Sequence, residues 1–207
     1  MRRAMMRLHW SSRSPFVRKV MVVAHEAGVA DRIERIPTVV ALTRQDPAVL
    51  RQNPLGKIPT LILENGRALY DSVVICEYLD GLGGSPRLFP SAGPARIESL
   101  RRQALGNGAL DFLLLWRGEI GRAAPDERII AGFEVKLAAV LATLEAEAAA
   151  LSAGPLDIGR VAIGCALSYL DFRWPGSGWR TAHPALAAWH AGFAARPSVR
   201  ATEHIDA

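Results

Sequence analysis

Residues 53–72 read NPLGKIPTLILENGRALYDS, and this stretch decides how the first part of the chain folds. Its apolar runs flank Glu-Asn-Gly, and Asn-Gly is a strong signal for the turn of a β-hairpin. We therefore expect hairpin strands at Thr60–Leu63 and Arg67–Tyr70. Proline cannot donate to a strand ladder, so Pro59 belongs at the first residue of a strand, on an edge or at a bulge.

The Ile58–Pro59 bond has two possible conformations with different consequences. If the bond is cis, the amide and carbonyl of Ile58 point into a cleft, where an extended peptide could pair with them as an extra strand does. If it is trans, Pro59 only blunts an edge strand. Residue spacing does not choose between these alternatives.

Working outward, the flanking segments alternate between strand and helix patterns. The predicted elements are a strand at Met6–Trp10, a helix from Pro15 to about Gly28, a strand at Ile33–Val40, a helical turn at Pro47–Gln52 and a helix from Ser72 to about Leu82. The order βαβαββα predicts a mixed sheet covered by helices on its faces.

The composition changes after residue 83. A stretch rich in glycine and proline at 81–94 is the candidate linker. Beyond it the chain is rich in alanine and leucine, and apolar residues recur at helical spacing from Ile130 and again from Ile158. A last helix is expected to end at Pro197.

Composition excludes several classes of protein. The chain has 207 residues and a net charge of +5. Its basic residues are scattered, so we expect no nucleic-acid partner, although the charge could attract an anionic small substrate. No apolar stretch is long enough for a membrane span. Cys76 and Cys165 lie far apart and form neither a disulfide framework nor a metal-binding spacing.

The first residues open like a signal peptide but lack its apolar segment. We therefore expect a cytoplasmic protein, with Met5 or Met6 as an alternative start.

Two helix starts carry polar residues that could bind a ligand. Asp71 and Ser72 lie where a strand passes into a helix, and residues there either cap the helix or hold the amino-acid end of a ligand. Ser14 precedes a helix that begins with Pro15. It is either a simple cap or a hydrogen-bond donor to a thiolate, because a helix N-terminus favours negative charge.

Three motifs in this order resemble the cytosolic glutathione transferases, most closely bacterial members of the YibF type. They are SPFVRKV (14–20), NPLGKIPTLILENGRALYDSVVICEYLD (53–80) and AIGCALSYLDFRW (162–174), and the resemblance covers nearly the whole chain. It implies an α/β thioredoxin-like N-terminal domain at 6–83 that binds glutathione. It also implies an all-α helical C-terminal domain at 92–207 that forms the cleft for an electrophile.

The resemblance also implies roles for particular residues. Ile58 would pair its backbone with the cysteinyl unit of glutathione, next to a cis Pro59. Asp71 and Ser72 would hold the γ-glutamyl end, and Lys57 would lie near a glutathione carboxylate. No metal is implied.

Ser14 stands at the position of the activating serine in serine-type members of this family. Ser11 and Ser12 are its local rivals, and tyrosine activation is excluded because Trp10 and Ser11 occupy the corresponding region. The implied activity is conjugation or reduction of small hydrophobic electrophiles or peroxides by the glutathione thiolate, in a homodimer. The alternatives are a non-catalytic ligand-binding or regulatory protein and a glutathione-dependent isomerase or dehalogenase.

The chain departs from the family pattern at Arg160, where members carry an acidic residue in a capping box. Asp157 can cap this helix, but Arg160 cannot accept from the cap residue. We therefore expect a weakened helix start that an acid at position 160 would stabilise. Asn107 and Asp111 are the polar exceptions on the helix that would line the cleft, and they face either solvent, the ligand or a partner subunit.

Overall fold

The computed structural model describes residues 5–41, 43–84 and 87–206. The prediction that the protein starts at Met5 or Met6 concerns residues 1–4, and these lie outside the described residues. The chain divides into two compact units. The first contains the chain up to Pro90 together with the segment from Ser198 onward, and the second is Ser91–Pro197.

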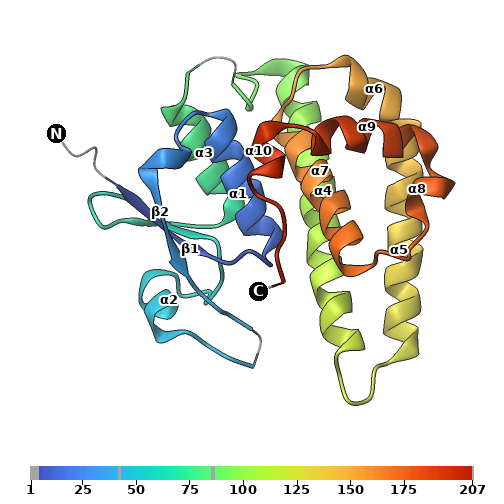
Figure 1. The fold of residues 1–207 in the computed structure, drawn as a ribbon, viewed down its shortest axis with the longest axis horizontal. Coiled ribbons are helices and arrows are strands. Elements are labelled where there is room, and N and C mark those ends of the chain that lie inside the picture. The colour runs from blue at the N-terminus through green and yellow to red at the C-terminus, as the bar shows by residue number, and fades with distance from the viewer. Residues whose placement is uncertain (1–4, 42, 85–86, 207) are drawn as a thin grey trace. The chain divides into compact units, whose positions relative to one another are not determined.

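The first unit is built on a mixed four-stranded sheet with the order β2-β1-β3-β4 (Figure 1). Its strands are β1 (Met6–Trp10), β2 (Ile33–Pro37), β3 (Thr60–Ile62) and β4 (Ala68–Leu69). β1 runs parallel to β2 and antiparallel to β3, and β3 runs antiparallel to β4. The expected mixed sheet and helical second part are both confirmed.

Three strands are shorter than their sequence patterns predict: β3 lacks Leu63, β4 lacks Arg67 and Tyr70, and β2 lacks its last three residues. β2 ends at Pro37 and not at Val40, because its pairing partner β1 ends at Trp10, which lies opposite Pro37. The Thr38 N–H still donates to the Trp10 carbonyl at 2.8 Å. Beyond that point Val39 is exposed.

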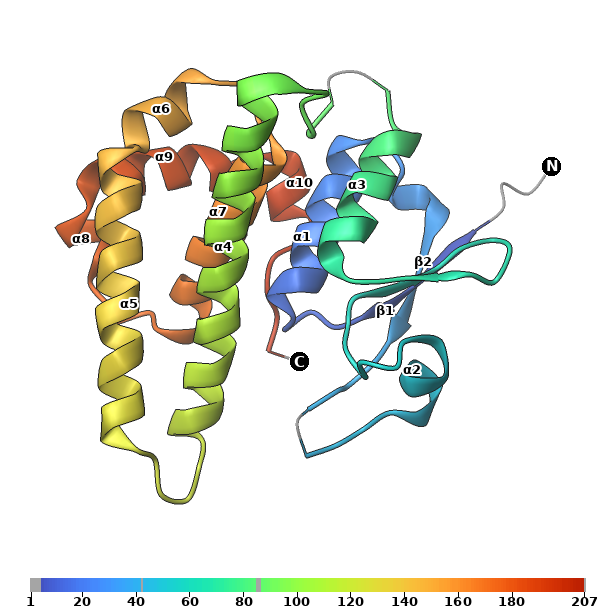
Figure 2. The same cartoon turned by 180° about the vertical axis from the view of Figure 1, so that it is seen from behind.

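Three helices accompany the sheet: α1 (Pro15–Glu26), α2 (Pro47–Gln52) and α3 (Ser72–Leu82). Ser14 caps α1 by accepting from the Val17 N–H at 3.3 Å, and Pro15 occupies the first helical position, as predicted. α1 and α3 pack side by side on one face of the sheet, and α2 lies on the other side (Figures 1 and 2). A short 3-10 helix, η1 (Ala30–Arg32), leads into β2.

The second unit is helical. Its helices are α4 (Gly93–Ile120), α5 (Glu127–Ala146), α6 (Ala148–Ala153), α7 (Ile158–Arg173), α8 (Trp179–Ala182) and α9 (Pro184–Ala194). Pro197 does not end α9, as the sequence led us to expect, but begins a separate short helix, α10 (Pro197–Arg200). No helix among the described residues is long and apolar enough to cross a membrane.

α7 is the central helix of this unit. The sequence predicted one apolar face, but every residue from Ile158 to Leu170 is buried. α4 packs closely against it at Gly106, where a Cβ atom would lie 2.6 Å from the backbone carbon of Ala162. Glycine at this position therefore sets how near the two helices can approach.

The expectation that Arg160 weakens the start of α7 is wrong. Asp157 caps the helix by accepting from the Arg160 N–H at 2.8 Å. The buried Arg160 guanidinium forms an ion pair with Asp157 and donates to the carbonyls of Leu151 at 2.9 Å and Ala150 at 2.8 Å. These bonds tie the end of α6 to the start of α7, so the arginine replaces the acid of the capping box with a different set of bonds.

Arg160→Asp is therefore expected to destabilise the protein. The substitution removes the guanidinium that donates to Asp157 and to two backbone carbonyls, and it places a second carboxylate beside buried Asp157. Loss of one partner of a buried ion pair costs about 3–5 kcal/mol. The free energy of unfolding in urea measures the effect. Arg128→Asp is a matched control, because Arg128 also pairs with the capping aspartate of its helix, Asp126, but its side chain is 91% exposed. Equal effects of the two substitutions would contradict a structural role for Arg160.

Candidate functional site

Three loops that carry the predicted site residues leave the sheet at the same end. His9 lies opposite Thr60, so the segment after β1 and the segment before β3 meet there. Leu61 lies opposite Leu69 in the antiparallel pair of β3 and β4, so the chain after β4 leaves at that end as well. The sheet order thereby brings together Ser14, the Lys57–Pro59 segment and the Asp71–Ser72 corner.

The Ile58–Pro59 peptide bond is cis, as the resemblance implied. Ile58 is half-buried and lies two residues before β3. Among the described residues, no group forms a hydrogen bond with its N–H or its C=O. Pro59 is buried, and Lys57 is exposed. The N–H and the C=O of Ile58 therefore both lack a partner in the part of the chain that the structure describes.

Asn53, which the sequence reasoning overlooked, holds this loop in place. It is 1% exposed, and its Nδ2 donates to the Lys57 carbonyl at 3.1 Å and to Thr60 Oγ1 at 2.9 Å. The Thr60 hydroxyl donates to the same Lys57 carbonyl at 2.8 Å. Asn53 Oδ1 also accepts from the Leu55 N–H at 3.0 Å, an Asx turn that an Asn-Pro pair could have signalled.

The loop also requires a glycine. Gly56 has φ of +61°, and its N–H donates to the Asn53 carbonyl at 2.9 Å. A Cβ atom at this position would lie 2.8 Å from Gln45 Oε1. The positive φ is what favours glycine here, since the exposed Gln45 side chain could move aside.

At the start of α3, Asp71 and Ser72 occupy different positions. Asp71 is the N-cap, and its Oδ1 accepts from the Val73 N–H at 2.9 Å. Ser72 is the first helical residue and is buried, so the helix-cap contribution expected of it belongs to Asp71. Among the described residues, nothing pairs with the Ser72 N–H or hydroxyl. The Tyr70–Asp71 bond is cis.

The three serines before α1 have different hydrogen-bonding states. The Ser12 hydroxyl donates a hydrogen bond to the Ile205 carbonyl at 2.8 Å. Ser11 Oγ accepts from the Arg13 N–H at 3.3 Å, and Ser14 Oγ accepts from the Val17 N–H at 3.3 Å. Ser11 and Ser14 therefore retain a hydroxyl proton for a ligand, and Ser14 combines it with the N-terminus of α1.

A buried histidine supports α2 beside this loop. His9 is 3% exposed, and its Nδ1 lies 2.9 Å from Thr38 Oγ1. Its Nε2 lies 2.6 Å from Gln52 Oε1, and Gln52 is the last residue of α2, directly before Asn53. His9 thus fixes the end of α2 against the sheet. No signal in the sequence pairs residues 43 positions apart.

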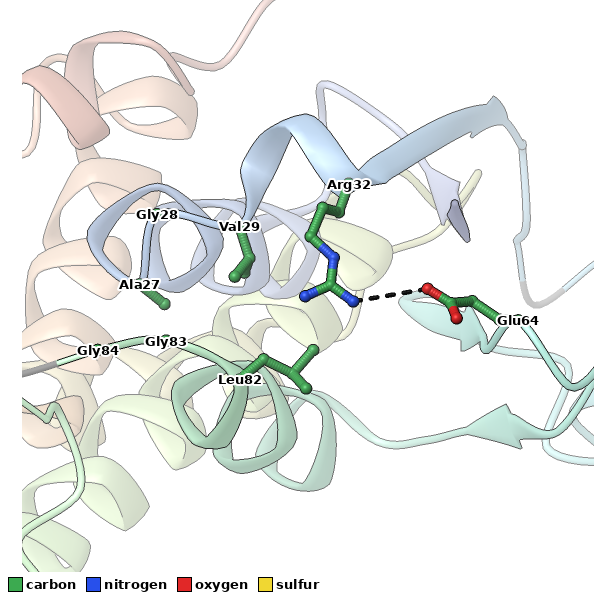
Figure 3. A pocket seen from close by; sticks show the side chains of 8 residues that line it. All are labelled: Ala27, Gly28, Val29, Arg32, Glu64, Leu82, Gly83 and Gly84. Atoms are coloured by element: carbon green, nitrogen blue, oxygen red, sulfur yellow. Dashed lines mark hydrogen bonds and ion pairs between the residues drawn. The ribbon is translucent and has the colours of Figure 1, made fainter. Parts of the chain in front are cut away.

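A hollow of about 550 Å³ lies at the opposite end of the sheet (Figure 3). Its lining residues are Ala27, Gly28, Val29, Arg32, Glu64, Leu82, Gly83 and Gly84. The Arg32 guanidinium points toward Glu64 across it, at 3.5 Å. The hollow contains none of the predicted site residues, and its charged groups already neutralise each other.

A serine, a histidine and an aspartate in the second unit resemble a catalytic triad. Ser168 Oγ lies 3.0 Å from His190 Nε2, but Asp171 Oδ2 is 3.9 Å from His190 Nδ1. The Arg180 Nη2, a donor, occupies that position at 2.8 Å. Because an arginine nitrogen cannot accept, His190 Nδ1 is the acceptor and its proton lies on Nε2, facing Ser168. His190 cannot then remove the serine proton, and the cluster is structural.

Two other predictions stay open. Asn107 is half-buried and Asp111 is exposed on α4, and the structure assigns neither a role. Within the part of the chain that the structure describes, no group of three or more His, Cys, Asp or Glu side chains is arranged to hold a metal ion.

Comparisons with known proteins agree with this fold. Residues 13–82 match the N-terminal domain of glutathione S-transferases, and residues 127–192 match their C-terminal domain. The uncharacterized GST-like protein YibF of Escherichia coli K12 is 30% identical over 204 residues, which cover 96% of this chain and 98% of YibF.

Solved structures are similar over nearly the full length. A glutathione transferase family member from Pseudomonas fluorescens Pf-5 with bound glutathione is 42% identical, has a TM-score of 0.93, and the match covers 97% of this chain and 99% of that one. A glutathione S-transferase from Methylobacillus flagellatus KT, also with glutathione bound, is 34% identical with a TM-score of 0.85, covering 97% and 100%. The chain belongs to the glutathione S-transferase family.

Asn53→Asp tests whether Asn53 holds the loop. Aspartate keeps the acceptor for the Leu55 N–H but sets a carboxylate against the Lys57 carbonyl. Unsatisfied buried groups of this kind cost about 1–3 kcal/mol, so the free energy of unfolding should fall by that amount and glutathione should bind more weakly. Asn65→Asp is the control, since Asn65 forms a similar turn through its Oδ1 with the Arg67 N–H on an exposed hairpin. Unchanged stability and binding in Asn53→Asp would rule out this role.

Proposed function

We propose that this protein is a glutathione transferase that joins the glutathione thiolate to small hydrophobic electrophiles or uses it to reduce peroxides. The observation that carries the proposal is the unpaired backbone of Ile58, at the same end of the sheet as the Ser14 hydroxyl and the Asp71–Ser72 corner. The glutathione in the two similar solved structures supports it.

Each end of glutathione has a complementary group in the first unit. Ile58 would donate to and accept from the backbone of the cysteinyl unit. The carboxylate of Asp71 would accept from the γ-glutamyl ammonium, since its bond to the Val73 N–H leaves acceptor capacity. The Ser72 N–H and hydroxyl would donate to the γ-glutamyl carboxylate. The exposed Lys57 would neutralise a carboxylate of the peptide.

Ser14 would stabilise the thiolate. Its oxygen already accepts from the Val17 N–H, which leaves the hydroxyl proton for the sulfur, and the N-terminus of α1 favours negative charge there. Lowering a thiol pKa by one unit takes about 1.4 kcal/mol, within the range of one charge-assisted hydrogen bond. In conjugation the sulfur forms a bond to the electrophilic atom as a leaving group departs with its electron pair. In peroxide reduction the sulfur takes up one oxygen as the O–O bond breaks and an alkoxide or hydroxide leaves, and a second glutathione thiol then forms the disulfide and releases water.

The electrophile pocket would be supplied by the helical unit, and the protein would act as a cytoplasmic homodimer. A non-catalytic binding protein would be retained on glutathione resin but would not turn over a model electrophile. A glutathione-dependent isomerase or dehalogenase would show its activity in a substrate panel.

Ser14→Ala is expected to lower kcat by at least about tenfold, while the Kd for glutathione changes little, because the hydroxyl acts on the thiolate. Thiolate absorbance of the bound peptide should show a higher thiol pKa. The alanine also removes a helix cap, at about 1 kcal/mol, so Ser14→Thr serves as the control that keeps both hydroxyl and cap. An unchanged thiol pKa in Ser14→Ala would move the assignment to Ser11.

Asp71→Asn separates binding from capping. Asparagine caps as well as aspartate, so stability should hold, but the charge that faces the ammonium is lost. The Kd for glutathione, measured by calorimetry, should rise about tenfold, as should that of Ser72→Ala, which loses a donor to a charged group. If neither variant binds glutathione more weakly, the corner serves only to begin α3.

A further inference from the structure

The C-terminal segment of the chain lies along α1 and returns to the loop that carries Ser14. Near the end of α1, Ser198 Oγ donates to Glu26 Oε1 at 2.5 Å. In the first turn of α1, Arg18 Nη2 donates to the Val199 carbonyl at 3.3 Å. The segment then runs beside α1 toward its N-terminus in both views (Figures 1 and 2).

At its far end the segment holds Ser12 by two hydrogen bonds. The Ser12 hydroxyl donates to the Ile205 carbonyl at 2.8 Å. His204 Nδ1 lies 3.0 Å from the Ser12 carbonyl. Because a carbonyl only accepts, His204 Nδ1 carries the proton and donates it. One residue is therefore held through both its side chain and its backbone.

Ser12 belongs to the turn that ends at Ser14. The Ser14 N–H donates to the Ser11 carbonyl at 3.2 Å, so residues 11–14 form a β-turn with Ser12 and Arg13 at its centre. A turn of four residues has little freedom once one of its central peptide groups is held. Fixing Ser12 therefore restricts the turn that leads into Ser14.

We propose that residues 198–206 act as a strap that positions Ser14, with His204 as its positioning residue. The inference rests on the proposed function, in which the Ser14 hydroxyl must donate to a thiolate. A hydroxyl that stabilises charge has to be held to within about 0.5 Å. The first turn of α1 holds Ser14 on one side, through the Val17 N–H and the Arg18 N–H, and the strap holds the turn that precedes Ser14.

The test compares three full-length variants with the unchanged protein. His204→Ala removes the donor to Ser12. His204→Asn restores a donor, because the asparagine amide nitrogen lies where Nδ1 does. Glu203→Ala is the matched control, an exposed neighbour on the same segment. The readouts are kcat with a model electrophile, the Kd and thiol pKa of bound glutathione, and amide hydrogen exchange of a peptide covering residues 8–17.

His204→Ala should lower kcat about three- to tenfold, the effect of one hydrogen bond, with a higher thiol pKa, faster exchange at residues 8–17 and a nearly unchanged Kd. His204→Asn should recover most of the loss, and Glu203→Ala should match the unchanged protein. If the unchanged protein turns over the electrophile but His204→Ala has the same thiol pKa and the same hydrogen exchange, the strap proposal is wrong and the proposed function stands. Absence of both glutathione binding and turnover in the unchanged protein would overturn the proposed function and, with it, this inference.

Discussion

The loop before β3 depends on one constraint, which is that neither the N–H nor the C=O of Ile58 has a partner among the described residues. A fully buried backbone group without a partner costs about 1–3 kcal/mol, and a half-buried one costs less. Neighbouring bonds have to offset this cost to hold the loop in that conformation. Asn53 does this through the Lys57 carbonyl and Thr60 on either side of the cis bond. His9 in turn holds the end of α2, from which Asn53 follows. The conformation of the Ile58 loop thus depends on two buried side chains, Asn53 and His9, the second of which lies in the sheet.

The arrangement of strands explains why polar groups from distant parts of the chain meet. β3 is antiparallel to both its neighbours, so the loops after β1 and after β4 come to the end of the sheet where β3 begins. Two of these loops lead into helix N-termini, which bring unpaired N–H groups to the same place. An anionic peptide thiol suits such a site better than a cation does, since helix N-termini favour negative charge.

Buried polar groups in the helical unit serve its packing. Arg160 connects α6 with α7, and the Ser168–His190–Arg180–Asp171 cluster connects α7, α8 and α9. In both cases an arginine occupies the position that a carboxylate would hold in a better-known arrangement, a capping box or a catalytic triad. Replacing one acceptor by a donor therefore turns a familiar motif into a different, structural arrangement.

Local signals in the sequence determined much of the first unit. Ser14 before Pro15, Asn-Gly in the hairpin and Asp71 before Ser72 each act on their own backbone neighbours. The starts of α1 and α3 and the place of the hairpin turn were predictable for that reason. The position of Ser14, Ile58 and Asp71 within known motifs indicated a glutathione site. Only the tertiary structure decided what Arg160, Asn53 and His204 do, because their partners depend on how helices and loops pack. The contact between His204 and Ser12 spans 192 positions in the sequence, a distance over which no periodicity or capping rule extends.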